Sequence, residues 1–148
     1  MGLPMPTTMR EQMGEVRVRV RLSNATDVDL AERGLIEPER VRSCEVDALV
    51  DTGATRSVVP TDVADRLGLT ILRQTFGRLA DGSRVPASLS SAILFEMQDR
   101  ATLEGAYVLG DEVLIGQTVL ESMDLLVDCA NRRVVPNPAH PEGPVLRL

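Results

Sequence analysis

The sequence predicts a mostly β protein, a closed or partly open β-barrel with one or two short helices. Short apolar segments recur roughly every ten residues along the chain, and turn-forming glycine, asparagine and aspartate residues separate them. Only two segments have apolar residues at helical spacing. The 148 residues fit a single domain. Because aromatic residues make up only 2% of the sequence, we expect valine, leucine and isoleucine to fill the core.

The strands are predicted from alternation and from turns. Residues 16–22 alternate between an apolar side chain and arginine, which indicates a half-buried strand with its arginines facing solvent. Asp81-Gly82 is a strong signal for the turn of a hairpin. The extended segments are expected at residues 16–22, 43–51, 70–78, 84–89, 91–97, 102–109, 113–115, 125–128 and 132–135.

The two helices are expected at residues 61–68 and 116–123. Pro60 or Thr61 begins the first and Gly68 ends it. Between the first two strands we expect a turn at residues 23–27 and, at residues 27–41, a loop with one helical turn.

The domain is expected to span residues 15–135. It would be preceded by a flexible tail at residues 1–14 and followed by a proline-rich, extended tail at residues 136–148. His140 lies among the prolines and is expected to be solvated.

Composition excludes several classes of function. The net charge of −6 and the scarcity of aromatic residues argue against a nucleic-acid partner, and the charge also argues against an anionic membrane surface. No apolar run is long enough to span a membrane, and the N-terminus does not resemble a signal peptide. Cys44 and Cys129 are interpreted as reduced thiols, which favours a cytoplasmic protein. No zinc spacing and no phosphate-binding glycine loop is present, so we predict neither a metal nor a cofactor.

The candidate site is Asp51-Thr52-Gly53-Ala54, which directly follows the apolar run 46–50. Taken alone, the tripeptide favours a strand end with a turn. However, a carboxylate next to a core must be hydrogen-bonded or share its charge. Metal-free peptide hydrolysis needs a water between a general base and a general acid, and two carboxylates about 3 Å apart can share one proton and play both roles. The chain has one such aspartate, so the second would come from a second copy.

In these features the chain resembles the retropepsin-like aspartic proteases, which have the retroviral protease fold. The resemblance is carried by residues 48–54, the helix signal at 63–68, the hairpin around 80–83, and residues 113–116 with the helix that follows. These motifs occur in the order found in the family. The resemblance implies a symmetric homodimer that acts as an aspartic endopeptidase on peptide or protein substrates.

The resemblance also implies a role for each matching segment. Asp51 would be catalytic, and Thr52, Gly53 and Ala54 would complete the active-site loop. A flap that closes over the substrate would be formed by residues Phe76, Leu79, Ala80, Asp81, Gly82 and Ser83. The loop behind the aspartate would be formed by Leu114, Ile115 and Gly116.

Two positions depart from the retroviral pattern. An acidic residue and an arginine usually form a charge pair there, whereas this chain has Thr55 and Gln117. We expect the contact that this pair supports to be built in another way. Two alternatives stay open: a dimeric peptide-binding module with little or no activity on the same fold, and a non-peptidase barrel in which Asp51 only ends a strand.

Overall fold

A computed structural model describes residues 15–148, so the tail expected at residues 1–14 lies outside the described part. The strands of the described part are β1 (Arg17–Asn24), β2 (Ser43–Val50), β3 (Val58–Val59), β4 (Ile71–Arg78), β5 (Arg84–Ser90), β6 (Ile93–Met97), β7 (Arg100–Glu104), β8 (Tyr107–Val108), β9 (Leu114–Ile115), β10 (Leu125–Asp128) and β11 (Arg133–Pro136). Its helices are α2 (Ala25–Glu32), α3 (Thr61–Arg66), α4 (Gln117–Met123) and the 3-10 helix η1 (Pro38–Arg40).

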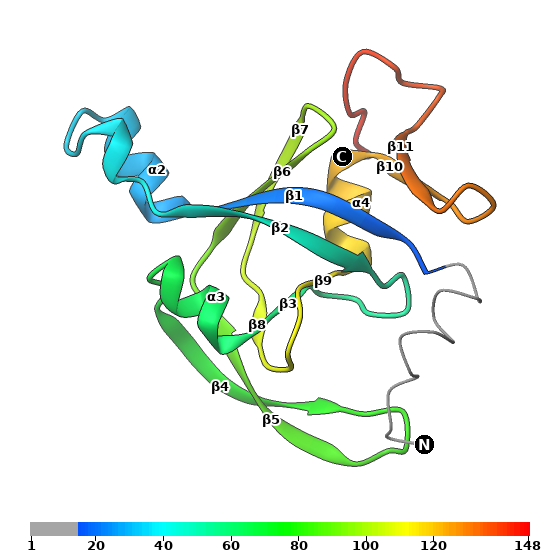
Figure 1. Cartoon of the computed structure of the whole chain (residues 1–148), viewed down its shortest axis with the longest axis horizontal. Helices are drawn as coiled ribbons and strands as arrows, with labels where there is room; N and C mark the ends of the chain where they lie inside the picture. The colour runs from blue at the N-terminus through cyan, green and yellow to red at the C-terminus, as the bar shows by residue number, and fades with distance from the viewer. Residues whose placement is uncertain (1–14) are drawn as a thin grey trace.

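Nine of these strands form one sheet, in the order β4-β5-β8-β3-β9-β2-β1-β6-β7, and β10 pairs only with β11. The sheet curls around the core and leaves β4 and β7 as its two edges (Figure 1). The prediction of a mostly β protein with a closed or partly open barrel is therefore confirmed, and the barrel is the partly open one.

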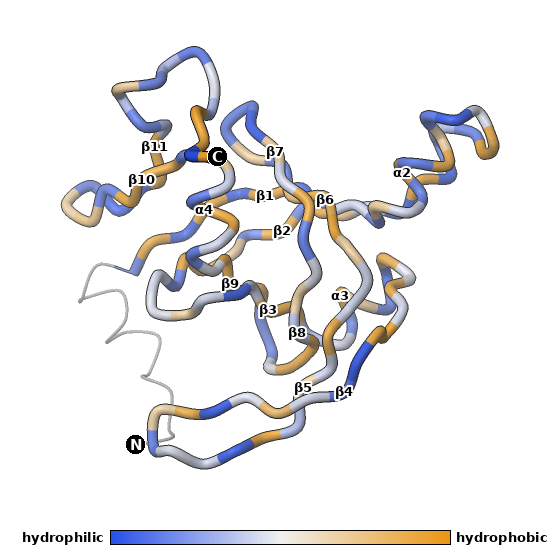
Figure 2. The backbone as a smooth tube through the Cα atoms, turned by 180° about the vertical axis from the view of Figure 1, so that it is seen from behind, coloured by the Kyte–Doolittle hydropathy of each residue, from blue (hydrophilic) through white to orange (hydrophobic). Residues whose placement is uncertain are grey.

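The strand β1 shows how the sequence pattern builds the core. Val18, Val20 and Leu22 are buried, whereas Arg19 and Arg21 are exposed, as the alternation predicts. Figure 2 shows such alternation of hydropathy along several strands. The next strand, β2, pairs with β1 on one side and with β9 on the other, where it runs parallel to β9. This parallel pairing places the end of β2 beside the end of β9, deep in the sheet.

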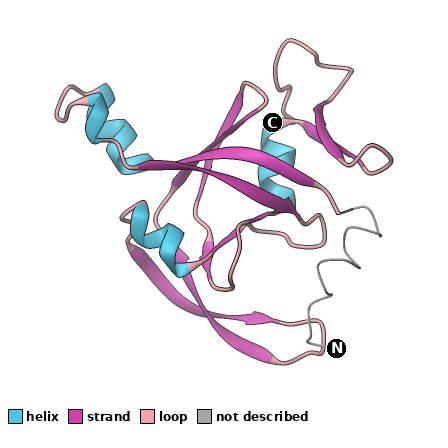
Figure 3. Ribbon diagram, in the orientation of Figure 1, coloured by secondary structure: helices cyan, strands magenta, loops and turns pink. Residues whose placement is uncertain are grey.

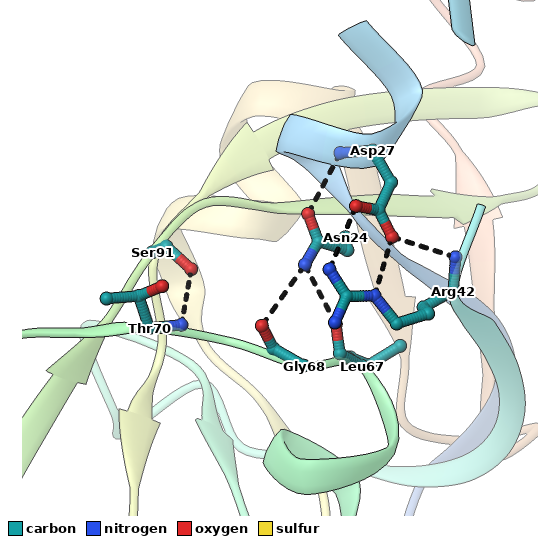
Figure 4. Close-up of polar contacts among 7 residues, drawn as sticks. All are labelled: Asn24, Asp27, Arg42, Leu67, Gly68, Thr70 and Ser91. Atoms are coloured by element: carbon teal, nitrogen blue, oxygen red, sulfur yellow. Dashed lines mark hydrogen bonds and ion pairs between the residues drawn. The ribbon is translucent and has the colours of Figure 1, made fainter. Parts of the chain in front are cut away.

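The structure differs from the prediction at helix α2. The structure has an eight-residue helix where a turn and a loop were expected, so the described part has three α-helices rather than one or two (Figure 3). Polar contacts rather than apolar spacing stabilise it (Figure 4). Asn24 caps the helix by accepting a hydrogen bond from the Asp27 N–H (3.0 Å), and its own amide donates to the Leu67 carbonyl (2.8 Å). Hydrogen bonds from the Arg42 side chain lower the pKa of buried Asp27.

The single strand expected at residues 102–109 is divided in two. Here β7 pairs with β6, whereas β8 pairs with β5 and β3, so the chain changes partners between them. The change occurs at Gly105, where an added Cβ would lie 2.6 Å from the Ser90 carbonyl oxygen. The Ser90 hydroxyl in turn accepts a hydrogen bond from the Ala106 N–H (3.1 Å). The break lies where the backbones at Gly105 and Ser90 approach each other closely.

The C-terminal segment is fastened to the body of the protein. Asp124, at the C-terminal end of α4, accepts hydrogen bonds from the Asn137 amide (3.0 Å) and the Val145 N–H (3.2 Å), and it pairs with His140 Nδ1 (2.5 Å). The buried Arg100 donates to the carbonyls of Asp124 (2.9 Å) and His140 (2.5 Å). The expectation that His140 is a solvated tail residue is therefore wrong, because its ring is half-buried against Asp124. No local pattern in the sequence indicates these partners.

These contacts make stability depend on pH. Hydrogen bonds from Asn137 and Val145, together with the His140 contact, lower the pKa of Asp124 from 3.8 to about 2. A depressed folded-state pKa contributes stability that is present above the unfolded value and is lost as the pH falls through the folded one. We therefore expect Asp124→Asn to destabilise the protein between about pH 5 and 8, and the gap to wild type to shrink below about pH 4.

Urea unfolding of both proteins across this pH range, at one protein concentration, measures the gap. Asp111→Asn is the control, because Asp111 is an exposed aspartate. A gap for Asp124→Asn that stays constant down to about pH 2 would contradict the assignment.

Candidate active site

The Asp51 loop begins where β2 ends. The Asp51 N–H donates to the Ile115 carbonyl of β9 (2.9 Å), which fixes the main chain at the aspartate. The turn that follows is closed by a hydrogen bond from the Ala54 N–H to the Asp51 carbonyl (3.1 Å), and the Gly53 N–H donates to Asp51 Oδ1 (3.0 Å). Asp51 is half-buried, whereas Thr52 and Gly53 are exposed. The loop therefore holds the carboxylate in one orientation at the surface.

The loop behind the aspartate packs against the chain that leaves the site. The Gly116 N–H donates to Ser57 Oγ (2.9 Å), and Ser57 is fully buried. A Cβ added at Gly116 would lie 2.5 Å from the Arg56 carbonyl carbon and 2.7 Å from its oxygen. Only glycine permits this approach of two backbones. The structure thus brings the predicted residues 114–116 against the Asp51 loop.

Helix α4 supports the loop from its other end. The Gln117 N–H donates to the Ala54 carbonyl (2.8 Å), and the Thr118 N–H donates to the Thr55 carbonyl (3.0 Å). Thr118 Oγ1 lies 3.0 Å from the Thr55 carbonyl oxygen and 2.7 Å from Glu104 Oε1, so its proton can be donated to either. These bonds join the segments of Thr55 and Gln117, the two positions at which the charge pair usual in retroviral members is absent.

Sequence reasoning missed Ser57 and Thr118. Each contacts a segment about sixty residues away in the chain, and neither belongs to a recognisable motif. Their roles depend on how the parallel β2–β9 pair brings distant loops together.

Removal of the Thr118 hydroxyl should therefore weaken the support of the loop. For Thr118→Val we expect a loss of about 0.5–1.5 kcal/mol in the free energy of unfolding, because the one hydrogen bond that the hydroxyl proton makes, to Thr55 or to Glu104, is lost. Urea unfolding measures the effect. Thr118→Ser keeps the hydroxyl and should stay close to wild type, and equal losses in the two variants would refute the hydrogen-bond argument.

The β4–β5 hairpin ends in an ordered turn. The Leu79 N–H donates to the Ser83 carbonyl (2.8 Å), and the Gly82 N–H donates to the Leu79 carbonyl (2.9 Å). Gly82 has a φ of +86°, which favours glycine. Asp81 accepts hydrogen bonds from the Ser83 hydroxyl and N–H, and these lower the pKa of Asp81. With Ala80, these residues form the predicted flap tip, which is polar.

The hairpin leaves apolar side chains uncovered. Phe76 is 60% exposed and Leu79 is 37% exposed. The Arg84 guanidinium lies 4.6 Å from the centre of the Phe76 ring. The hairpin extends away from the rest of the sheet (Figure 1), and apolar and polar stretches alternate along it (Figure 2). Apolar surface of this kind is available to contact a bound chain.

A groove of about 480 Å³ lies between the hairpin and the Asp51 loop. Gly53 and Ala54 line it from the loop, Leu79 and Val85 from the hairpin, and Tyr107 from β8. The structure therefore brings part of the predicted loop and part of the predicted flap to one cavity. The remaining flap residues, Phe76, Ala80, Asp81, Gly82 and Ser83, are not part of its lining.

Within the described residues, no group of three or more histidine, cysteine, aspartate or glutamate side chains could hold a metal ion. Over the same range, none of the helices is both long and apolar enough to cross a membrane.

The comparison with protein families finds a match over the segment that contains these loops. The family model described as aspartyl protease matches residues 38–128, which include the Asp51 loop, the hairpin and β9. The chain therefore belongs to the aspartyl protease family. No curated protein gives a significant match to the chain.

Solved structures that are similar to the chain include retroviral and retroviral-like proteases. The EIAV protease complexed with the inhibitor HBY-793 is 22% identical, with a TM-score of 0.44 over 52% of this chain and 75% of that one. The retroviral protease-like domain of Ddi1 from Leishmania major is 15% identical, with a TM-score of 0.49 over 83% and 90%. A retropepsin-like aspartic protease from Rickettsia conorii is 16% identical, with a TM-score of 0.43 over 78% and 85%.

Proposed function

We propose that this protein is an aspartic endopeptidase that works as a homodimer, in which the Asp51 carboxylates of two copies hold one water. The observation that carries the proposal is the single Asp-Thr-Gly loop of an aspartyl protease chain. Within residues 15–148, the Asp51 carboxylate receives one hydrogen bond, from Gly53, and forms no ion pair. Thr52 and Gly53 are exposed beside it, so a second copy can cover this surface.

The chemistry follows from two carboxylates placed close together. They cannot both ionise without strong repulsion, so one stays protonated and the pair acts as acid and base at once. The ionised carboxylate removes a proton from the water as it attacks the peptide carbonyl, and the protonated one donates to the carbonyl oxygen. The Gly53 N–H on Asp51 Oδ1 leaves Oδ2 available to the shared water.

The hairpin supplies the binding surface. An extended peptide in the groove would lie between the hairpin and the Asp51 loop and add main-chain hydrogen bonds as a strand does. The apolar side chains of Leu79, Val85 and Tyr107 would accept apolar substrate residues. Closure of the hairpin over the peptide would exclude water from the reaction.

Mixing subunits tests the shared site. Asp51→Asn chains are added to a fixed amount of wild type and allowed to exchange, and cleavage of a peptide library is measured. In a homodimer with one shared site, an equal amount of variant should lower activity to about half, because mixed dimers hold only one carboxylate. Activity that the variant leaves unchanged would contradict the shared site. Sedimentation velocity shows whether the dimer forms at the concentration used.

The peptide-binding alternative predicts a different outcome. A module without activity would bind library peptides as a dimer but release no products at any pH. Wild type and Asp51→Asn would then behave alike in both binding and cleavage assays.

A further inference from the structure

The lining of the groove carries two positive charges and no negative charge. Arg56 lines it from the Asp51 loop and Arg78 from the hairpin, and every other lining residue is uncharged. Among the described residues, neither guanidinium has an ion pair or a side-chain hydrogen bond, and both arginines are exposed. This local charge occurs on a chain whose net charge is −6.

Five other arginines of the described chain form ion pairs with carboxylates, whereas others, among them Arg40, Arg66 and Arg73, form none. The pairs are Arg17 with Glu15 and Glu112, Arg19 with Glu45, Arg33 with Asp29, Arg42 with Asp27, and Arg133 with Asp128. What distinguishes Arg56 and Arg78 is their position, because both line the groove beside the Asp51 loop and neither is paired within residues 15–148. Their donors are therefore available to a ligand in the groove.

We propose that Arg56 and Arg78 make the groove selective for peptides that carry an aspartate or glutamate beside apolar residues. A guanidinium offers a planar set of donors that matches a carboxylate, and its attraction is stronger next to an apolar wall than in open water. Leu79, Val85 and Leu109 provide such a wall in the same groove. The inference rests on the proposed function in one respect, that the peptide substrate occupies this groove.

The test compares peptide pairs that differ only in glutamate against glutamine. The probes are fluorescein-labelled apolar decapeptides with the single glutamate or glutamine at each position in turn. Their binding to Asp51→Asn is measured by fluorescence anisotropy at low salt and above about pH 6, where glutamate is ionised. Cleavage of the same pairs by the wild-type chain is measured in parallel, so that binding and catalysis are read separately.

At one or more positions we expect the glutamate peptide to bind about two- to fivefold more tightly for each arginine engaged. Arg56→Gln and Arg78→Gln should each reduce this glutamate-to-glutamine ratio. Arg40→Gln removes the same charge from η1, outside the groove, and should leave the ratio unchanged. Salt at about 1 M should bring the ratio toward one, because it screens exposed charges.

The outcomes separate this inference from the proposed function. If wild type cleaves both members of every pair equally and the anisotropy ratios are one, the selectivity is refuted while the endopeptidase stands. If Asp51→Asn prefers the glutamate peptides but wild type cleaves neither, the selectivity stands and the proposed function fails. A preference that survives in both arginine variants, or the absence of any binding, would also refute the assignment.

Discussion

Asp51→Asn is expected to abolish peptide cleavage and to leave the fold intact. The amide keeps an oxygen that can accept the hydrogen bond from the Gly53 N–H, so the loop retains its shape. An amide cannot act as a general base or carry the shared proton, and each such group typically contributes a hundred- to ten-thousandfold. Because both copies lose their carboxylate, we expect kcat to fall by at least about a thousandfold.

The cleavage assay needs a matched control variant and a test that the Asp51 variant is folded. Asp65→Asn is the matched control, because Asp65 is an exposed aspartate on α3, outside the site, and its replacement should leave kcat unchanged. Circular dichroism and sedimentation establish that the Asp51 variant is still folded and of the same size. If the Asp51→Asn protein cleaves peptides as fast as wild type, the proposal that Asp51 is catalytic is refuted.

Gly116→Ala should damage both stability and activity. The added methyl group would lie 2.5 Å from the carbonyl carbon of Arg56 and 2.9 Å from the Ser57 nitrogen. These are backbone atoms, so no side chain can move aside, and we expect a loss of about 1–3 kcal/mol in the free energy of unfolding. A displaced loop would also misplace Asp51, and misplacement of about 1 Å can cost roughly a hundredfold in rate.

Gly143→Ala is the matched control for this substitution. A Cβ added at Gly143 meets no atom within 4 Å, and Gly143 is not among the glycines with positive φ. We expect its stability and kcat/KM to stay close to wild type. If thermal unfolding and peptide cleavage show no difference between the two variants, the close packing at Gly116 is not what holds the loop.

Much of the fold was predictable because local patterns and global packing agree. The alternation in β1 places valines inside and arginines outside, and Asp81-Gly82 does form the turn of a hairpin. The helices α3 and α4 lie within the ranges predicted for them. The Asp51 loop was recognisable because its residues are adjacent in sequence and its chemistry needs few of them.

The rest depends on contacts between distant segments. The helix α2 is stabilised by Asn24, Asp27 and Arg42, and its apolar residues do not follow a helical pattern that the sequence would show. The division between β7 and β8 follows from the proximity of Gly105 to another strand. The groove joins residues of four segments, so the two unpaired arginines in it emerge only once the chain is folded.

The change of strand partners at Gly105 places two functions on one short piece of chain. On one side of it, Glu104 contacts Thr118, which braces the Asp51 loop; on the other side, Tyr107 forms part of the groove wall. The groove proposed to bind the peptide and the loop that holds Asp51 thus contact the same segment, residues 104–107. A substitution that displaces the backbone of this segment would move the groove wall and the Asp51 loop together. We therefore expect substrate affinity and the position of the Asp51 carboxylate to change together rather than independently.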